Sequence, residues 1–232
     1  VSVYAAKQLY KDDKTVEHLY DLATLVLLGA VLGSRLYFVA FNLSYFLQNP
    51  VEILQIWHGG LSIHGAMIGG IIAGGFYTCL NKLSFLKYAD LIVLGVILGQ
   101  AIGRWGNFFN SEAFGTPTKL PWKLYIPPAL RPEQFMQYEY FHPTFLYESI
   151  WNLLVFLFLF FVVKNHPKYV QGMVFFSYLI LYSIGRIFIE SLRVDSIYAF
   201  LGIQLAQWAS IILIVVGIIG LLYVTFFRHH ID

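Results

Sequence analysis

Six runs of about 20 largely apolar residues constrain this chain more than any other feature of its sequence, because a helix of that length crosses a bilayer. Only 12% of the 232 residues are charged, against roughly 25% in soluble domains, which leaves little sequence for a soluble domain. We predict an all-α, polytopic membrane helix bundle. The expected spans are Asp21 to Asn42, Leu61 to Leu80, Ala89 to Asn110, Pro143 to Val163, Gly172 to Leu192 and Gly202 to Phe227.

Lysine and arginine set the expected orientation, because short cytoplasmic loops carry an excess of them. The richer set of loops should face the cytoplasm; it carries Lys7, Lys11, Lys14, Lys82, Lys87, Lys164, Lys168 and Arg228. The other set carries only Lys119, Lys123 and Arg131, all within residues 111–142. That long, proline-rich segment is therefore expected on the outer face, and long loops are often functional.

The chain is expected to form one membrane domain, residues 21–232, which includes the outer loop 111–142. Residues 1–20 should form a cytoplasmic segment or the remnant of a truncated first helix. They show no charged, apolar and small-residue pattern of a signal peptide. A net charge of +2 gives no basic face, which argues against a nucleic-acid partner, and the single cysteine excludes an internal disulfide.

Ionisable residues fall at one expected depth, in the outer part of five helices. A charge in hydrocarbon costs a few kcal/mol, so such residues are candidates for function. Cationic groups gathered at the level of the lipid headgroups predict an anionic ligand there. For Arg35 and Arg193 taken alone, anchoring of the helix end at the interface is an equal alternative. The residues concerned are Arg35, His64, Arg104, Glu148, Arg186, Glu190 and Arg193.

The segment GRWGNFFNSEAFG, residues 103–115, joins one expected helix to the outer loop. Arg104 suits bidentate binding of a phosphate, and Asn107 and Asn110 can donate hydrogen bonds to glycerol or phosphoryl oxygens. Glu112 and Gly115 complete the motif. Its glycines permit close approach of backbone or of a headgroup, although ordinary helix caps would also explain them.

The segment HGGLSIHGAMIGG, residues 58–70, places His64 one turn inside the membrane. His64 is the one conventional base expected at this depth, although a lone histidine is more often structural. Gly65 and Gly69 are spaced as in tightly packed membrane helices, and we expect that role for them. No third ligand converges at metal spacing, so no metal site is predicted.

Two further motifs carry polar residues. HPTFLYES, residues 142–149, opens an expected helix and holds the candidates His142, Tyr147 and Glu148. YSIGRIFIESLRVDS, residues 182–196, closes the next one and contributes Tyr182. In that segment the spacing i, i+4 and i+7 puts three charged residues on one helical face, where they can form an ion-pair ladder; they are Arg186, Glu190 and Arg193.

These four motifs, in this order, resemble the prolipoprotein diacylglyceryl transferase family of bacterial membrane enzymes. The resemblance runs from about Asp21 to the C-terminus. It implies seven helices in a full-length family member, of which the first has no match here. The family implies transfer of the diacylglyceryl group of phosphatidylglycerol to the lipobox cysteine of a prolipoprotein. The products are a thioether and glycerol phosphate. The resemblance also implies a site facing outward from the bacterial inner membrane, with no metal or other cofactor.

By this resemblance, Arg104 and Arg186 match the family's functionally critical arginines, and His64 matches the histidine of its HGG motif. Asn107, Glu112 and Gly115 match its signature positions, and Glu190 and Tyr182 fall in its segment around the second arginine. Arg104, Arg186, His64, Glu112 and Glu190 are the candidate catalytic residues. The candidate substrate-binding residues are Asn107, Asn110, Gly115, Tyr182, His142, Tyr147, Glu148 and Arg193. Phe145 stands where the family commonly has glutamine.

The residue chemistry is consistent with that reaction, because a leaving phosphate needs preorganised donors and two arginines supply them. We expect Arg104 and Arg186 to bind the phosphate, with Glu112 and Glu190 orienting them. His64 or a carboxylate would deprotonate the substrate thiol. Cys79 lies toward the cytoplasmic end of its helix, so the nucleophile should come from the substrate. A transporter or a noncatalytic lipid-binding protein for an anionic headgroup is the alternative.

Overall fold

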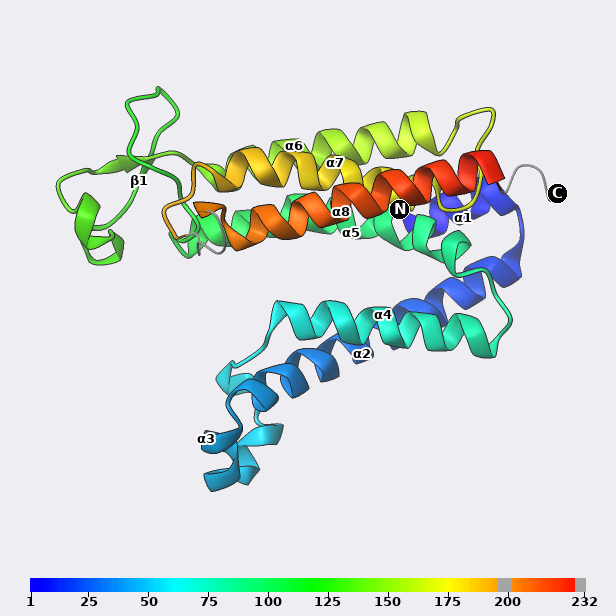
Figure 1. Ribbon diagram of the computed structural model, residues 1–232, viewed down its shortest axis with the longest axis horizontal. Helices are drawn as coiled ribbons and strands as arrows, with labels where there is room; N and C mark the ends of the chain where they lie inside the picture. The colour runs from blue at the N-terminus through cyan, green and yellow to red at the C-terminus, as the bar shows by residue number, and fades with distance from the viewer. Residues whose placement is uncertain (196–201, 228–232) are drawn as a thin grey trace. The chain divides into compact units, whose positions relative to one another are not determined.

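The computed structural model describes residues 1–195 and 202–227. The chain divides into two compact units, one of Val1–Ser2 with Ala89–Asp232 and one of Val3–Tyr88 (Figure 1). In the described chain, six helices are long and apolar enough to span a membrane, which confirms the predicted bundle. These spans are Asp13–Phe41, Ile63–Leu80, Phe85–Phe109, Thr144–Val163, Met173–Glu190 and Leu205–Phe226.

The first span starts earlier than the sequence suggested. A short helix, α1 (Ser2–Tyr10), is followed by α2 (Asp13–Phe41), which begins eight residues before the expected Asp21. Asp12 caps α2, because its carboxylate accepts hydrogen bonds from the Lys14 amide and the Thr15 hydroxyl. The capped helix therefore begins within the polar run KDDKTVEH, residues 11–18, which the sequence had suggested lies before the first span.

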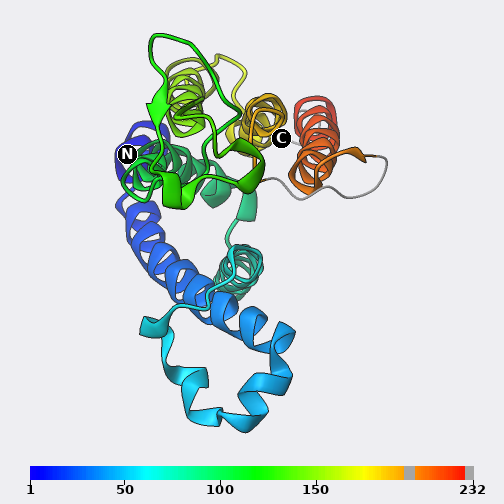
Figure 2. The same cartoon turned by 90° about the vertical axis from the view of Figure 1, so that its left-hand side faces the viewer.

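In the unit Val3–Tyr88, α2 packs against α4 (Ile63–Leu80), as both views show (Figures 1 and 2). Glycines form this contact. A Cβ added at Gly33 would meet the Gly65 carbonyl, and one added at Gly69 would meet the Gly29 carbonyl. The prediction of tight packing at Gly65 and Gly69 is thereby confirmed.

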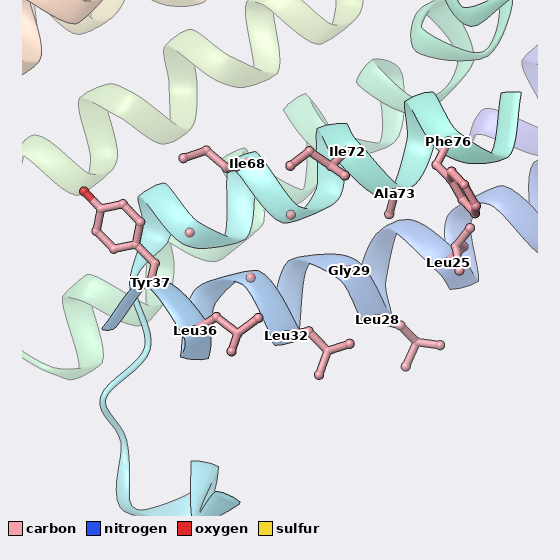
Figure 3. Close-up of a pocket in the computed structure, with 13 residues that line it drawn as sticks. Leu25, Leu28, Gly29, Leu32, Leu36, Tyr37, Ile68, Ile72, Ala73 and Phe76 are labelled. Atoms are coloured by element: carbon pink, nitrogen blue, oxygen red, sulfur yellow. The ribbon is translucent and has the colours of Figure 1, made fainter. Parts of the chain in front are cut away.

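The same two helices line a shallow groove of glycine and apolar side chains (Figure 3). Leu28, Leu32 and Leu36 extend along α2, and Ile68 and Ile72 along α4. This surface suits contact with lipid chains or with another apolar helix. It holds no charged group, so the chemistry predicted from the sequence must lie elsewhere.

Arg35 has a structural role in this unit. Its guanidinium is buried and donates hydrogen bonds to the backbone carbonyls of Glu52, Ile53, Gly59 and Gly60. These carbonyls belong to the connection between α2 and α4, which contains α3 (Leu43–Gln48) and short 3-10 turns at Pro50–Leu54 and Ile56–His58. Arg35 therefore holds this connection against the helix and does not snorkel to the interface.

The other unit contains four of the long helices, which run side by side (Figures 1 and 2). They are α5 (Phe85–Phe109), α6 (Thr144–Phe158), α7 (Met173–Glu190) and α8 (Leu205–Leu222). Short π-helical segments extend α6 through Leu159–Val163 and α8 through Tyr223–Phe227. Buried side chains of α5, α6 and α7 form the core of this unit; they include Leu91, Leu94, Ile97, Val155 and Val174.

The segment between α5 and α6 is ordered by a small antiparallel sheet that the sequence did not predict. β1 (Leu124–Tyr125) pairs with β2 (Tyr140–Phe141), and 3-10 turns at Pro128–Leu130 and Glu133–Phe135 lie between them. Phe114, Ile126 and Phe141 form an apolar core of their own beneath this sheet. The predicted outer loop is therefore a folded cap at one end of α5 and α6.

Candidate functional site

A buried carboxylate, Glu148, joins two of the predicted arginines. It lies in the second turn of α6 and is 5% exposed. One oxygen, Oε2, pairs with Nε of Arg104 from α5, and the other, Oε1, lies 2.5 Å from a terminal nitrogen of Arg186 from α7. Three helices that are separate in the sequence thus bring two guanidiniums onto one carboxylate.

A second carboxylate holds Arg186 from its own helix. Glu190 Oε2 lies 2.6 Å from the other terminal nitrogen of Arg186, the i, i+4 pair that the sequence predicted. Glu190 is 4% exposed, so this pair is also buried. Because both terminal nitrogens of Arg186 face carboxylates, the plane of its guanidinium is fixed.

Arg193 departs from the expected ladder. The helix α7 ends at Glu190, so Arg193 does not continue its face. Its Nε and one terminal nitrogen instead bind both oxygens of Asp195, at 2.9 and 2.7 Å. The other terminal nitrogen lies 3.8 Å from Glu148, at the rim of the same cluster.

Arg193 and Asp195 perturb each other's ionisation. Burial alone would lower the pKa of the Arg193 guanidinium, but hydrogen bonds and charge attraction to Asp195, with weaker attraction to Glu190 and Glu148, raise that pKa. Burial would likewise raise the pKa of the Asp195 carboxyl, but the hydrogen bond and positive charge of Arg193 bring that pKa below its ordinary value. Both groups therefore carry their charges at neutral pH.

The motif after Arg104 forms a polar network at the end of α5. Asn107 accepts a hydrogen bond from Arg104 at 3.4 Å and donates one to Glu112 at 2.9 Å. Asn110 donates to the same Glu112 oxygen at 3.2 Å. Glu112 therefore acts on Arg104 through Asn107, and the carboxylate in direct contact with Arg104 is Glu148. That Glu112 helps to orient Arg104 stays a prediction.

Gly115 is required by close packing. Its amide donates to the His142 carbonyl at 2.9 Å, and its backbone pairs with Arg193. An added Cβ would meet His142, Thr144 and the Leu192 carbonyl at 2.8 to 3.0 Å. Gly115 thus lets the cap, the start of α6 and the chain after α7 meet beside the cluster.

His142 and Tyr147 form a hydrogen-bonded pair next to the cap. Nδ1 of His142 lies 3.1 Å from the Tyr147 hydroxyl, which also accepts a hydrogen bond from Trp122 at 3.0 Å. Tyr147 precedes Glu148 on α6, so the pair flanks the ion cluster. Phe145 is buried and packs its ring against Trp105.

Tyr182 lies one turn before Arg186 on α7. Its ring stacks on Tyr178, with 5.6 Å between the ring centroids. The Tyr178 hydroxyl in turn exchanges hydrogen bonds with the Gln100 amide, at 3.1 and 3.2 Å. Neither Tyr178 nor Gln100 was singled out from the sequence, because neither belongs to a charged motif.

His64 belongs to the other unit, Val3–Tyr88, so the structure does not join it to the arginine cluster. It lies in the first turn of α4, is exposed, and has its ring 6.0 Å from that of Tyr37. Among the residues that the structure describes, no three histidine, cysteine, aspartate or glutamate side chains are placed to hold a metal ion.

The helices and the cluster together define a class of protein. Six apolar helices make the chain a multi-pass membrane protein. The guanidiniums of Arg104 and Arg186, near the ends of α5 and α7, are partly exposed and meet on one carboxylate, so they offer paired donors to an anionic group. This combination is that of a membrane protein that handles an anionic lipid or solute at one end of its bundle.

The chain belongs to the prolipoprotein diacylglyceryl transferase family, whose model matches residues 1–223. The phosphatidylglycerol–prolipoprotein diacylglyceryl transferase of Acaryochloris marina is 50% identical over 202 residues, which cover 87% of this chain and 73% of that protein. The protein of the same name from Thermosynechococcus vestitus is 48% identical over 88% of this chain and 76% of its own length. That from Thermotoga maritima is 47% identical over 96% and 76%, respectively.

Proposed function

We propose that this protein transfers the diacylglyceryl group of phosphatidylglycerol to the lipobox cysteine of a prolipoprotein, at the outer face of the bacterial inner membrane. The observation that carries the proposal is the meeting of Arg104 and Arg186 on the buried carboxylate of Glu148. The family membership and the activity for which the relatives are named identify the substrates. The geometry supplies the means of binding a phosphate.

The reaction exchanges one bond at a lipid carbon. The substrate sulfur forms a bond to the terminal glycerol carbon of the diacylglyceryl group, and the bond from that carbon to the phosphate oxygen breaks. The electron pair of the broken bond leaves with glycerol phosphate, and the thiol proton is available to the leaving phosphate. The products are the thioether and glycerol phosphate, so atoms and charge balance.

The two arginines stabilise the charge that develops on the leaving phosphate. Donors that are gathered at one place before the chemical step stabilise the developing charge with little reorganisation during that step, which is the source of electrostatic catalysis. Asn107 presents its amide beside Arg104 and is placed to contact the phosphoryl or glycerol oxygens. Before the phosphate binds, Glu148 and Glu190 hold the guanidiniums in place.

His64 or one of the carboxylates accepts the thiol proton in this proposal. Glu148 and Glu190 are each already paired to arginine. That consideration favours His64, because an imidazole is the commonest general base in enzymes. His142 and Tyr147, beside the cap, are assigned to substrate binding.

The test is a transfer assay with the full chain. The purified protein is incubated with phosphatidylglycerol and a lipobox peptide, and mass spectrometry follows the gain of one diacylglyceryl group. Arg104→Gln and Arg186→Gln are each expected to lower the rate by at least about 100-fold, as removal of a transition-state donor does. Arg131→Gln is the matched control, because that arginine belongs to the cap, where it donates to the carbonyls of Ile126 and Met136 and lies over the Tyr125 ring.

If the unaltered protein transfers the diacylglyceryl group and both variants retain that activity, the proposed site is contradicted. Tight binding of phosphatidylglycerol by the unaltered protein with no adduct on the peptide would instead support a noncatalytic lipid-binding protein. Movement of the lipid headgroup or a soluble anion across a sealed vesicle would support a transporter.

A further inference from the structure

A layer of uncharged polar side chains lies one helical turn below the arginine cluster. Asn152 follows Glu148 by four residues on α6, and Ser183 precedes Arg186 by three on α7. Residues at these spacings share a helix face, so both side chains lie on the side of the charged groups and about 5.4 Å deeper. Gln100 has the same relation to Arg104 on α5.

Contacts between the helices fix this layer in register. The Trp151 indole on α6 donates to the Leu181 carbonyl on α7 at 3.0 Å. The Ser149 hydroxyl donates to the Ala101 carbonyl on α5 at 2.8 Å. Ala101 is next to Gln100 and Leu181 is two residues before Ser183 in the sequence. The two hydrogen bonds therefore hold Asn152 near both side chains.

Two donors in this layer have no acceptor among the residues described. They are Nδ2 of Asn152, which is 2% exposed, and the hydroxyl of Ser183, which is fully buried. Buried hydroxyls elsewhere donate within their helices, Ser210 to the Ala206 carbonyl and Thr78 to the Gly74 carbonyl. A buried polar group without a partner is costly in an apolar surrounding. Two such donors beside one site indicate a ligand that brings an acceptor.

We propose that Asn152 and Ser183 bind an ester carbonyl oxygen of the lipid whose phosphate lies on Arg104 and Arg186, an inference that rests on the proposed function. An ester carbonyl accepts hydrogen bonds and carries no charge, which matches two neutral donors. In a glycerolipid the ester groups lie between the phosphate and the acyl chains. A lipid with its phosphate in the cluster therefore directs its esters toward the deeper layer.

Glu148 separates this layer from the charged end of the site, because it lies one turn above Asn152 on the same face of α6. When the phosphate takes the two guanidiniums, it replaces the Glu148 carboxylate as their partner. The displaced side chain opens the way to Asn152 and Ser183. The cluster thus selects the phosphate, and the layer beneath it selects ester-linked over ether-linked glycerolipids.

The test compares two lipids that differ only in this carbonyl, diacyl phosphatidylglycerol and its dialkyl ether analogue. With the unaltered full chain, we expect kcat/KM for transfer to a lipobox peptide to be about tenfold higher with the diester. Ser183→Ala and Asn152→Leu should each bring this ratio close to one. Ser210→Ala, a buried serine with a partner, should leave the ratio unchanged. Inhibition by glycerol phosphate, which has no ester carbonyl, should be the same in all four proteins.

Equal rates with the two lipids in the unaltered protein would overturn this inference alone, whether or not a variant folds. Retention of the tenfold ratio in both folded variants would also overturn it. Failure of the unaltered protein to transfer either lipid would overturn the proposed function and this inference together.

Discussion

Charge balance at single residues determines how the site can receive a phosphate. Three arginines face three carboxylates in the cluster, so a bound anion must replace one carboxylate as a partner or leave the site with excess negative charge. Glu148 is the carboxylate best placed for that exchange, since it touches two guanidiniums from different helices. The six groups are Arg104, Arg186, Arg193, Glu148, Glu190 and Asp195.

Glu148→Gln is expected to impair both stability and transfer. It leaves Arg104 and Arg186 without their common counter-charge, and breaking an ion pair at a buried carboxylate costs about 3 kcal/mol of unfolding free energy. The arginines should then move apart, and kcat/KM should fall by about 100-fold. Thermal unfolding in detergent and the peptide transfer assay measure the two effects.

Glu133→Gln is the control for this substitution, because Glu133 is exposed in the outer cap. It should change neither quantity measurably. A Glu148→Gln protein with transfer within twofold of the unaltered rate would contradict the assignment of Glu148 to the site.

At this scale the sequence identified the arginines but not the partners that position them. Arg104 and Arg186 stand in recognisable motifs, and the spacing of Glu190 predicted its pair with Arg186. The bridge through Glu148 joins residues 44 and 38 positions apart, which no local pattern reveals. Nor could the sequence show that Arg193 turns to Asp195, because that depends on where α7 ends.

The packing of α2 against α4 could be predicted from the sequence. Gly65 and Gly69 are spaced to lie on one face, and the structure places them against Gly33 and Gly29. Close approach of the two backbones replaces the large side chains that a soluble core would use. The arginine cluster depends instead on the contacts of α5, α6 and α7, which no spacing of glycines predicted.

Gly69→Ala should destabilise the protein by about 1 to 3 kcal/mol, since the added methyl group collides with the α2 backbone. Gly75→Ala on the same helix is the matched substitution, because an added Cβ there meets nothing within 4 Å. Alanine is the better helix former, so Gly75→Ala should gain roughly 0.5 to 1 kcal/mol. Thermal unfolding of both variants measures the difference, and equal effects would contradict the packing role.

A buried aspartate of α5 caps the start of α7. The Asp90 carboxylate accepts hydrogen bonds from the amides of Gly172 and Phe175 and from the Tyr169 hydroxyl, each at 2.7 Å. The first amides of a helix have no partner within it, so this carboxylate from a neighbouring helix supplies one. The cap fixes the end of α7 opposite to Arg186.

Asp90→Asn should destabilise the protein by about 1 to 3 kcal/mol, because an amide cannot accept hydrogen bonds at both positions and leaves a buried donor unpaired. Glu17→Gln, an exposed acidic residue of α2, should have little effect. Thermal unfolding again provides the measurement. An unchanged midpoint for Asp90→Asn would show that the cap contributes nothing.

Periodicity and composition predicted where the membrane helices lie but not how their ends are made. Apolar runs fixed all six spans, because the cost of exposing polar groups to hydrocarbon dominates there. The start of α2 depended on one side chain, Asp12, and the sheet of β1 and β2 on pairing across 14 intervening residues, Ile126 to Glu139. Such contacts form only when the chain has folded.

For the whole molecule, function requires that the cluster face the side of the membrane where the prolipoprotein cysteine arrives. The distribution of lysine and arginine predicts that the cap between α5 and α6 is on the outer face and that the end of α4 is on the cytoplasmic face. The single cysteine, Cys79, is exposed near that end of α4 and serves as a natural reporter.

A membrane-impermeant maleimide tests this orientation. Applied to intact spheroplasts, it should leave Cys79 unmodified, because the reagent does not reach the cytoplasmic face. In a Cys79→Ser background, Lys123→Cys in the exposed cap should be modified under the same conditions. Inverted vesicles should give the reverse result, and permeabilised membranes should give modification at both positions. Modification of both cysteines from the same side would contradict the orientation, and loss of transfer in folded Cys79→Ser would contradict a nucleophile supplied by the substrate.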